Sequence, residues 1–341
     1  MATGNLRTID LRPAADDFLA DVLRGLTSSP KFLQPKYCYD GQGSQYFNEI
    51  CTLDDYYVTR SEMRMLASID EVSLGRAGKV AVIELGGASS DKFHHLLRFL
   101  PDVDLYIPID ISRDSLFNSA KQLAIDVPTL DVVAICADYE QMADISWAEL
   151  LQGRTPVLFY PGSTLGNLPQ AEAKALLQTM RGVVGDHGFI LLGCDLEKDP
   201  SISLGAYDDC KGANARFNLN ILHRINAELG GNFDSAAFRH DVRFNPKASQ
   251  IEIYLTSLID QVVTVKDHVI ELAAGESIHA EISRKFRRSE LAELAVSTGF
   301  CPLQCWTDEA FQFAIMLWSA KRSDAHQTAD VNRLSTDKGG L

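Results

Sequence analysis

The chain has 341 residues, of which 46% are hydrophobic and 23% charged, a composition typical of a folded globular protein. Its 32 basic and 46 acidic residues give a net charge of −14. Nucleic-acid binding needs a basic surface, so this balance argues against a DNA or RNA partner. The seven cysteines contain no C-x-x-C pair and the eight histidines show no ligand spacing, so we expect a protein without a metal.

The N-terminal segment is polar and lacks the apolar core of a signal peptide. No apolar run approaches the roughly 18 residues that cross a bilayer. We therefore expect a cytoplasmic protein with reduced cysteines and no membrane partner.

Residues 8–60 are expected to form helices and turns rich in aromatic side chains. From about residue 79 onward, apolar runs alternate with amphipathic segments such as 170–184. Continuous apolar strands with helical crossovers predict a parallel sheet that is covered on both faces. The expected strands are 80–85, 103–109, 132–137, 155–160 and 188–193.

Residues 196–286 interrupt this alternation. We expect this stretch to begin helical over 202–229 and to continue with strands at 250–256, 262–265, 268–272 and 278–283. The alternation then returns with a helix at 289–298 and a hairpin of strands 303–307 and 311–319. The pattern predicts a core of 61–195 and 287–321, a second domain of 8–60 and 196–286, and a disordered tail over 322–341.

The most informative local feature follows the strand at 80–85. There Glu84-Leu-Gly-Gly87 leads into the polar run Ala88-Ser-Ser-Asp91. A strand, a tight turn and a helix N-terminus let the backbone approach a nucleotide-like ligand. Asp110 ends the next strand, where a carboxylate can bind both hydroxyls of a ribose. This arrangement indicates a nicotinamide or flavin dinucleotide or S-adenosylmethionine, and a purely structural turn stays open as an alternative.

The residues of the turn favour S-adenosylmethionine. The dinucleotide fingerprint requires further glycines after Gly87, and these are absent. Asp91 would also repel a pyrophosphate. S-adenosylmethionine has no phosphate, and its cationic sulfonium and amino groups suit the carboxylates of Glu84 and Asp91.

Further motifs are spread along the chain and agree with a single family. They are Pro35-Lys-Tyr-Cys-Tyr-Asp40, Asp55-Tyr-Tyr-Val-Thr-Arg60, Gly162-Ser-Thr-Leu-Gly-Asn-Leu168, Ala206-Tyr-Asp-Asp209, Arg216-Phe-Asn-Leu-Asn220 and Glu281-Ile-Ser-Arg-Lys-Phe286. With them the chain resembles the L-histidine Nα-methyltransferases of ergothioneine biosynthesis over nearly its whole length.

The resemblance implies an α/β fold of the class I S-adenosylmethionine-dependent methyltransferases. This Rossmann-like fold has a mostly parallel seven-stranded sheet, here with an inserted α+β substrate-binding domain. The implied reaction moves methyl groups from S-adenosylmethionine to the α-amino group of L-histidine and gives Nα,Nα,Nα-trimethylhistidine (hercynine). The family implies a monomer with a small-molecule amino-acid substrate and no metal.

The resemblance also implies site residues. The cofactor contacts would be Tyr39, Gly86, Lys92, Asp110, Asp138 and Tyr139. Asp110 would hold the ribose hydroxyls and Asp138 the adenine amino group, while Tyr139 would flank the base.

The implied amino-acid pocket consists of Tyr56, Gly162, Asn167, Tyr207, Ile253, Glu281 and Ser283. Asn167 and Tyr207 would hold the substrate carboxylate. Glu281 and Ser283 would bind the two imidazole nitrogens. Tyr39 and Tyr56 are the expected catalytic residues, which would orient the amine or help to remove its proton.

Two positions depart from the family pattern. Ala88 replaces a glycine that is usual in the turn, and Ile253 stands where the histidine enzymes have methionine. Isoleucine is stiffer at χ1, and methionine adapts better to an aromatic edge. An enzyme for another amino acid or aromatic amine, tryptophan-like or a modified histidine, is therefore the alternative. Glu281 and Ser283 favour histidine, because an indole offers a buried carboxylate only one donor.

A third hypothesis comes from another class of function. The chain could be a noncatalytic binding module or a Rossmann oxidoreductase. Tight binding of a nicotinamide cofactor, without binding of S-adenosylmethionine, would establish the oxidoreductase.

Overall fold

The computed structural model describes residues 6–11, 15–70, 72, 74, 78–310 and 312–320. The chain forms two compact units. Unit 1 takes in Met1–Arg12, Val58–Glu197 and Lys285–Leu341, and unit 2 takes in Pro13–Tyr57 and Lys198–Arg284. The tail at 322–341, for which we expected disorder, lies outside the described residues.

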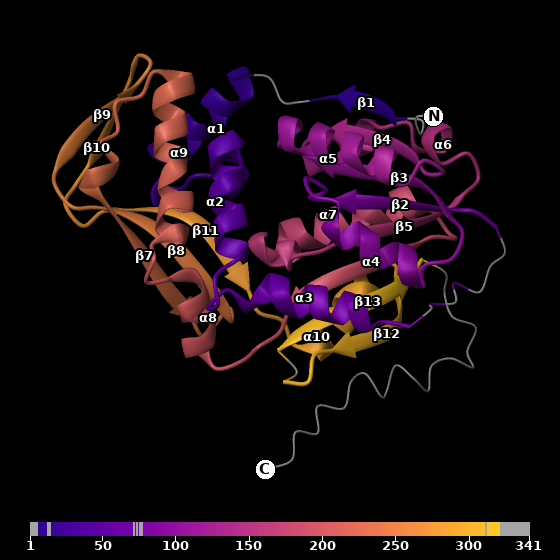
Figure 1. Ribbon diagram of the computed structural model, residues 1–341. Coiled ribbons are helices and arrows are strands. Elements are labelled where there is room, and N and C mark those ends of the chain that lie inside the picture. The colour runs from indigo at the N-terminus through magenta and orange to yellow at the C-terminus, as the bar shows by residue number, and fades with distance from the viewer. Residues whose placement is uncertain are drawn as a thin grey trace, which may run out of the picture. The chain divides into compact units, whose positions relative to one another are not determined.

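Unit 1 is built around an eight-stranded sheet with the order β1-β4-β3-β2-β5-β6-β13-β12 (Figure 1). Its strands are β1 (Leu6–Asp10), β2 (Val80–Leu85), β3 (Val103–Asp110), β4 (Asp131–Cys136), β5 (Thr155–Tyr160), β6 (Phe189–Asp195), β12 (Cys301–Thr307) and β13 (Phe313–Ser319). Only β13 pairs antiparallel with its neighbours β6 and β12. Every residue of β2, β6 and β13 is buried, as continuous apolar strands in a covered sheet should be.

The eighth strand corrects the expected count of seven. Residues 8–10, which the pattern assigned to helices and turns of the second domain, belong to β1 and pair parallel with β4 from Leu6↔Val132 to Asp10↔Cys136. The strand is short and mostly exposed. It covers the edge of β4, whose backbone groups would otherwise have no strand partner on that side.

Helices lie on both faces of this sheet (Figure 1). The helices of unit 1 are α3 (Tyr57–Ser68), α4 (Asp91–Phe99), α5 (Arg113–Asp126), α6 (Trp147–Leu151), α7 (Gln170–Val184) and α10 (Arg288–Ser297), with short 3₁₀ turns η2 (Tyr139–Asp144) and η3 (Thr164–Asn167). On one face Phe93 of α4 stacks on Tyr106 of β3, with ring centroids 3.8 Å apart. On the other face Ile107 shares a buried cluster with Leu177 of α7.

Unit 2 combines helices with two small antiparallel sheets, ordered β11-β8-β7 and β10-β9. Its elements are α1 (Ala15–Thr27), η1 (Pro35–Cys38), α2 (Gly41–Cys51), α8 (Pro200–Tyr207), α9 (Ala213–Leu229), η4 (Ser235–Ala237), β7 (Phe238–Asn245), β8 (Gln250–Ser257), β9 (Gln261–Val265), β10 (His268–Leu272) and β11 (Ser277–Arg284). Helix α9 packs against α2 within this unit. The sequence pattern did not predict strand β7.

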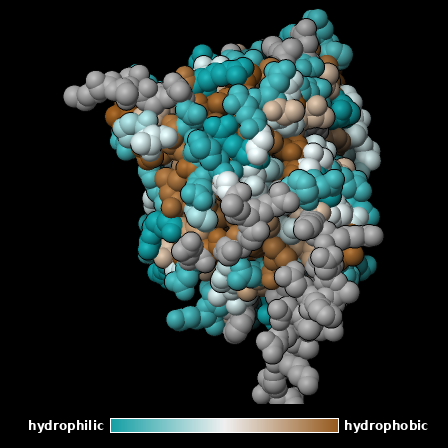
Figure 2. All heavy atoms as spheres, turned by 90° about the vertical axis from the view of Figure 1, so that its right-hand side faces the viewer, coloured by the Kyte–Doolittle hydropathy of each residue, from teal (hydrophilic) through white to brown (hydrophobic). Residues whose placement is uncertain are grey.

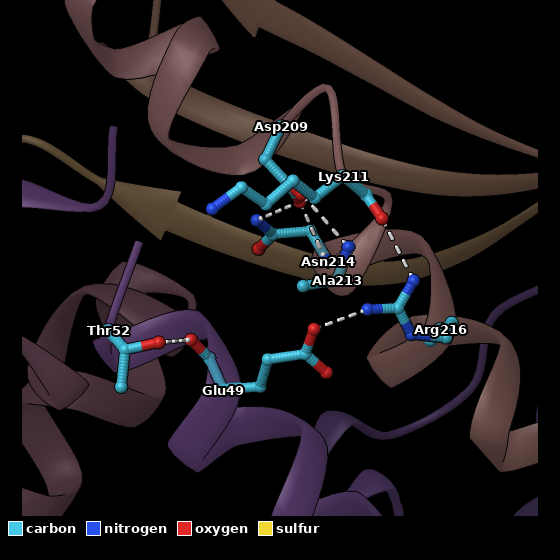
Figure 3. Close-up of polar contacts among 7 residues, drawn as sticks. All are labelled: Glu49, Thr52, Asp209, Lys211, Ala213, Asn214 and Arg216. Carbon is cyan, nitrogen blue, oxygen red and sulfur yellow. Dashed lines mark hydrogen bonds and ion pairs between the residues drawn. The ribbon is translucent and has the colours of Figure 1, made fainter. Parts of the chain in front are cut away.

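The helical stretch expected over 202–229 consists of two helices, because Asp209 caps a new helix that begins at Ala213. Its carboxylate accepts hydrogen bonds from the backbone N–H groups of Ala213 and Asn214 at 2.9 and 2.8 Å and from Asn214 Nδ2 at 2.9 Å (Figure 3). An acidic side chain at this place satisfies the free donors of a helix N-terminus. Arg216, one turn into α9, then binds Glu49 of α2 at 2.6 Å (Figure 3). The break leaves Tyr207 as the last residue of α8.

Hydrophilic side chains cover much of the face that Figure 2 shows, and apolar residues reach it in separate patches. Among the helices that the structure describes, none is both long and apolar enough to cross a membrane.

Candidate active site

The turn after β2 is held against the end of β3. Gly86 has φ +81°, a conformation that side-chain-bearing residues rarely adopt. The N–H groups of Gly86 and Gly87 both donate to the carbonyl of Ile109, at 2.9 and 3.2 Å. A Cβ on Gly87 would lie 2.7 Å from Cβ of Pro108. Both glycines are therefore needed for the turn to pack where β3 ends.

Asp110 faces this turn. Its carboxylate accepts hydrogen bonds from the backbone N–H groups of Ser112, Ala88 and Ile111, the first at 2.7 Å. Burial raises the pKa of Asp110 to about 6 in spite of these hydrogen bonds, which act in the opposite direction. The group is ionised at neutral pH and offers acceptor oxygens suited to two ribose hydroxyls. Ala88, the departure from the family pattern, supplies a backbone contact that does not depend on its side chain.

Asp138 and Tyr139 follow β4. The Asp138 N–H donates to Oε1 of Gln141 at 2.9 Å. The Tyr139 ring meets the ring of Tyr160 edge to face, with centroids 5.7 Å apart. The Tyr139 hydroxyl lies 3.3 Å from the position that a Cβ on Gly86 would take. The structure thus brings Gly86, Asp110 and Tyr139 to the same end of the sheet, and these groups fit an adenosyl ligand.

The role expected for Glu84 needs correction. Its carboxyl accepts a hydrogen bond from the Tyr106 hydroxyl at 2.8 Å, and the side chain is almost fully buried. Burial raises the pKa of Glu84 to about 8, so most of it is uncharged at neutral pH. It does not supply the full negative charge toward a sulfonium that the sequence suggested. Asp91, the other acid, accepts a hydrogen bond from the Ser89 hydroxyl at 2.9 Å.

Lys92 is paired with a residue that the sequence did not single out. Its Nζ lies 2.7 Å from Oε2 of Glu62, a side chain of α3 with no exposed surface. The same carboxylate accepts the N–H of Gly162 through both oxygens, at 2.9 and 3.0 Å. Glu62 lies 30 residues before Lys92 and 100 before Gly162. The sequence signal for it is the helical spacing of Glu62 with the apolar residues Val58, Met65 and Leu66, which places an acid on the apolar face of α3.

Gly162 and Asn167 lie in the segment after β5. Ser163 has φ +58° and its hydroxyl accepts the backbone N–H of Asp195 at 2.9 Å. Asn167 is the last residue of η3, whereas the residue that precedes α7 is Pro169. Asn167 is therefore not the cap of α7.

Three tyrosines of unit 2 lie in an aromatic cluster. Tyr39 packs edge to face on Phe47 and Phe217, with centroids 5.5 and 5.0 Å apart. Tyr56 meets the ring of Tyr207 at 5.9 Å. Burial raises the pKa of Tyr56 well above its ordinary value, so its phenol keeps its proton. It can orient an amine by hydrogen bonding, and it is a poor candidate for a tyrosinate base.

Asp40 fixes the segment that carries Tyr39. Its carboxylate caps α2 by accepting the N–H of Gly43 at 2.7 Å, and it also accepts Nδ2 of Asn220 at 2.7 Å. The motifs at 35–40 and 216–220 are thus joined directly. Their polar residues build the scaffold of the aromatic cluster.

Tyr207 and Ser283 are in direct contact. Their hydroxyl oxygens are 2.7 Å apart and both side chains are buried. The resemblance assigns them to opposite ends of the amino acid. In the structure they form one polar pair across α8 and β11.

Glu281 and Ser283 share the buried face of β11. They pair with Ile253 and Ile251 of β8, and the register shifts between His279 and Glu281. This bulge leaves Ala280 unpaired and moves Glu281 from the face of Glu252 to the face of Ile253. Glu281 is 8% exposed, Ser283 1% and Ile253 0%.

The expected site residues divide between the two units. Gly86, Lys92, Asp110, Asp138, Tyr139, Gly162 and Asn167 lie in unit 1, and Tyr39, Tyr56, Tyr207, Ile253, Glu281 and Ser283 lie in unit 2. Within the part of the chain that the structure describes, no three His, Cys, Asp or Glu side chains are grouped to hold a metal ion.

Three features define a class I S-adenosylmethionine-dependent methyltransferase. They are the sheet order, the single antiparallel strand β13, and the glycine turn after β2 that faces Asp110 at the end of β3. The chain belongs to the family of histidine-specific, S-adenosylmethionine-dependent methyltransferases, whose model matches residues 18–320.

Relatives with curated names agree with this membership. The chain is 35% identical to the histidine N-alpha-methyltransferase of Mycolicibacterium smegmatis over 310 residues, which cover 89% of this chain and 95% of the relative. It is 34% identical to the enzyme of the same name from Mycobacterium tuberculosis, over 87% of this chain and 93% of the relative. A 4-dimethylallyltryptophan N-methyltransferase of Claviceps purpurea is 23% identical, over 91% of this chain and 97% of the relative.

Proposed function

We propose that this enzyme transfers methyl groups from S-adenosylmethionine to the α-amino group of L-histidine and releases hercynine for ergothioneine biosynthesis. The observation that carries the proposal is the bulge at Ala280. Glu281 and Ser283 share one face of β11 by alternation, and the bulge turns that face to the buried side. There the two side chains offer two polar contacts in an apolar wall of Ile251 and Ile253. An imidazole has two ring nitrogens, and a pair of buried polar groups matches them.

The proposed roles follow from the chemistry of each group. Glu281 accepts an imidazole N–H in a charge-assisted hydrogen bond, and Ser283 binds the second nitrogen. The hydroxyl of Tyr207, 2.7 Å from that of Ser283, holds the carboxylate end of the amino acid. A site that holds both ends fixes the direction of the α-amine, and alignment is the main requirement of this reaction.

The transfer is an in-line displacement. The neutral amine attacks the sulfonium methyl group, the carbon–sulfur bond breaks, and its electron pair stays on sulfur to give the neutral thioether. The methylated nitrogen then carries a positive charge and must lose a proton before the next transfer. The protonated phenol of Tyr56 and the ring of Tyr39 orient the amine, and aromatic faces stabilise the final trimethylammonium group.

The donor contacts are proposed for unit 1. Asp110 would bind the ribose, Asp138 the adenine amino group, and Gly86 and Tyr139 the remaining surface of the nucleoside. Unit 2 would serve as the substrate-binding domain. A metal-free monomer is part of the proposal, which retention of activity in a chelator and a single sedimenting species of monomer mass would support.

The deciding experiment is mass spectrometry of products after incubation with S-adenosylmethionine and L-histidine. Products that carry one, two and finally three added methyl groups on histidine would support the proposal. Unmodified histidine, in the presence of demonstrated cofactor binding, would contradict it.

One observation favours a second candidate substrate. Ile253 pairs directly with Glu281, and by the resemblance it takes the place of a methionine of the histidine enzymes. A tryptophan-derived amine is the substrate named for the relative from Claviceps purpurea. The same assay with tryptophan and other aromatic amino acids tests this candidate. Faster methylation of one of them than of histidine would establish it.

A further inference from the structure

Glu62 is a carboxylate placed at the junction of three elements of unit 1. It projects from α3, pairs with Lys92 of α4 at 2.7 Å and accepts the Gly162 N–H, after β5, at 2.9 and 3.0 Å. Its side chain has no exposed surface. Removing a charge from water this completely is costly unless its partners are well placed, so the arrangement is specific.

The sheet makes room for this carboxylate. A Cβ on Gly193 of β6 would lie 1.8 Å from Oε1 of Glu62. Any other residue at 193 would displace the acid. Gly193 is the third residue from the end of the parallel strand β6, and Gly162 follows β5. Glu62 therefore lies at the carboxyl ends of both strands, the side of the sheet on which α/β proteins bind ligands.

Lys92 brings a positive charge to that same side. It is the second residue of α4, the helix that follows the turn at Gly86. Its Nζ lies 3.6 Å from the position that a Cβ on Gly162 would take. The α-carboxylate that S-adenosylmethionine shares with S-adenosylhomocysteine can bind an ammonium group here, whereas the cationic sulfonium of S-adenosylmethionine is repelled by it. Like charges in a partly buried site repel more strongly than in water.

Two other acids near this turn, Glu84 and Asp110, cannot cancel that charge to the same degree. Glu84 is mostly uncharged at neutral pH because burial raises its pKa to about 8. Asp110 is engaged by three backbone N–H groups. Glu62 is the acid whose oxygen is within ion-pair distance of Lys92.

We propose that Glu62 is a positioning residue that compensates the charge of Lys92, so that the site accepts the cationic methyl donor while the turn at Gly162 keeps its place. The inference rests on the proposed function only for the identity of the donor. Its readout is ligand binding without amino acid, so a failure to methylate histidine would not affect it.

The test compares S-adenosylmethionine with S-adenosylhomocysteine, which lacks the methyl group and the sulfonium charge. Their dissociation constants are measured by titration calorimetry for the wild type and for Glu62→Gln. The variant keeps the shape of the side chain and an oxygen acceptor for Gly162. We expect the ratio of the two constants to shift by about tenfold against the cationic ligand, because both ligands share every other contact.

Two further variants test in which direction each charge shifts the ratio of the two dissociation constants. Lys92→Met removes the cation from a side chain that is 21% exposed, and it should shift the ratio toward S-adenosylmethionine. This variant also serves if Glu62→Gln does not fold. The double variant Glu62→Gln/Lys92→Met removes both charges and should return the ratio to that of the wild type.

The matched control is Asp104→Asn. Asp104 forms ion pairs with Lys79 and Arg154, both at 2.6 Å, at the amino ends of the strands. The control should leave the ratio unchanged. Equal weakening of both ligands in Glu62→Gln, or an unchanged ratio in Lys92→Met, would show that Glu62 acts through structure alone and would overturn the inference.

Discussion

Glu281 lies directly opposite Ile253 in the antiparallel pair of β11 and β8. Regular alternation through His279-Ala-Glu would have paired Glu281 with Glu252 instead. The unpaired Ala280 shifts the register by one residue, and a shift of one residue exchanges the two faces of a strand. The bulge therefore points the Glu281 side chain toward the buried face of the sheet, beside Ile253.

The first prediction concerns Glu281→Gln. If its carboxylate binds an imidazole N–H, the variant should raise the KM for histidine by about 10- to 100-fold, the worth of one hydrogen bond to a charged group. The change in kcat should be smaller, since the group does not touch the reacting atoms. Steady-state kinetics with varied histidine measures both.

The control for this prediction is Glu252→Gln. Glu252 is on the neighbouring strand, opposite Ile282, and it accepts hydrogen bonds from Asn245 and Tyr254 on the other face of the sheet. Its substitution should leave the KM for histidine unchanged. Equal effects of the two variants would contradict the assignment of Glu281.

The second prediction concerns the pair of Tyr207 and Ser283, whose hydroxyls are 2.7 Å apart. Tyr207→Phe and Ser283→Ala each break this hydrogen bond, so the double variant should lose less than the sum of the single losses. We expect a coupling of about 1 kcal/mol in kcat/KM for histidine, a common size for residues that touch. Additive losses would show that the two hydroxyls act on the substrate independently.

The third prediction is a pH dependence of cofactor binding. Burial raises the pKa of Asp110 to about 6, so its carboxylate gains a proton as the pH falls below this value. A protonated carboxyl cannot accept both ribose hydroxyls. The affinity for S-adenosylmethionine should fall below about pH 6 by up to about tenfold per pH unit.

Asp110→Asn separates this group from others that titrate. The variant should bind the cofactor more weakly at neutral pH and should lose the dependence near pH 6. Calorimetric titrations between pH 5 and pH 8, compared with the wild type, decide the matter. A variant that keeps the full dependence would assign it to another residue.

The fourth prediction concerns a buried ion pair in unit 1. Lys285 Nζ lies 2.8 Å from Oδ2 of Asp195, and the two side chains are 1% and 0% exposed. Lys285→Met leaves the Asp195 carboxylate without this cation in the interior. It should lower the free energy of unfolding by about 3–5 kcal/mol.

Urea denaturation of the wild type and the variant measures this loss. The double variant Lys285→Met/Asp195→Asn removes both charges and should recover part of it. A single variant as stable as the wild type would mean that water or another group replaces the lysine.

Much of unit 1 could be predicted from the sequence. The strands of its parallel sheet are continuous apolar runs, and an observed strand such as β5 agrees residue for residue with the expectation. Gly86 and Asp110 stand out because a turn of this geometry needs a glycine and a ribose needs an acceptor. These features depend on residues close together in the chain.

The second unit was harder to predict because its signals are weaker. The break at Asp209 looks like the interior of a helix until its carboxylate is seen to cap α9. Strand β1 of unit 1 was missed as well, because five residues that are mostly exposed carry little periodicity. In both cases the deciding partner lies outside the local pattern.

The sequence by itself determined the class of fold, the cofactor turn and the family, since these rest on local periodicity and on residue types at short spacing. Only the tertiary structure decided the environment of each charge. Glu84 lost most of its charge to burial, Lys92 gained a buried partner in Glu62, and Glu281 reached the inner face through a bulge. The physical reason is that register and burial arise from contacts between distant segments, and these contacts set the ionisation and direction of a side chain.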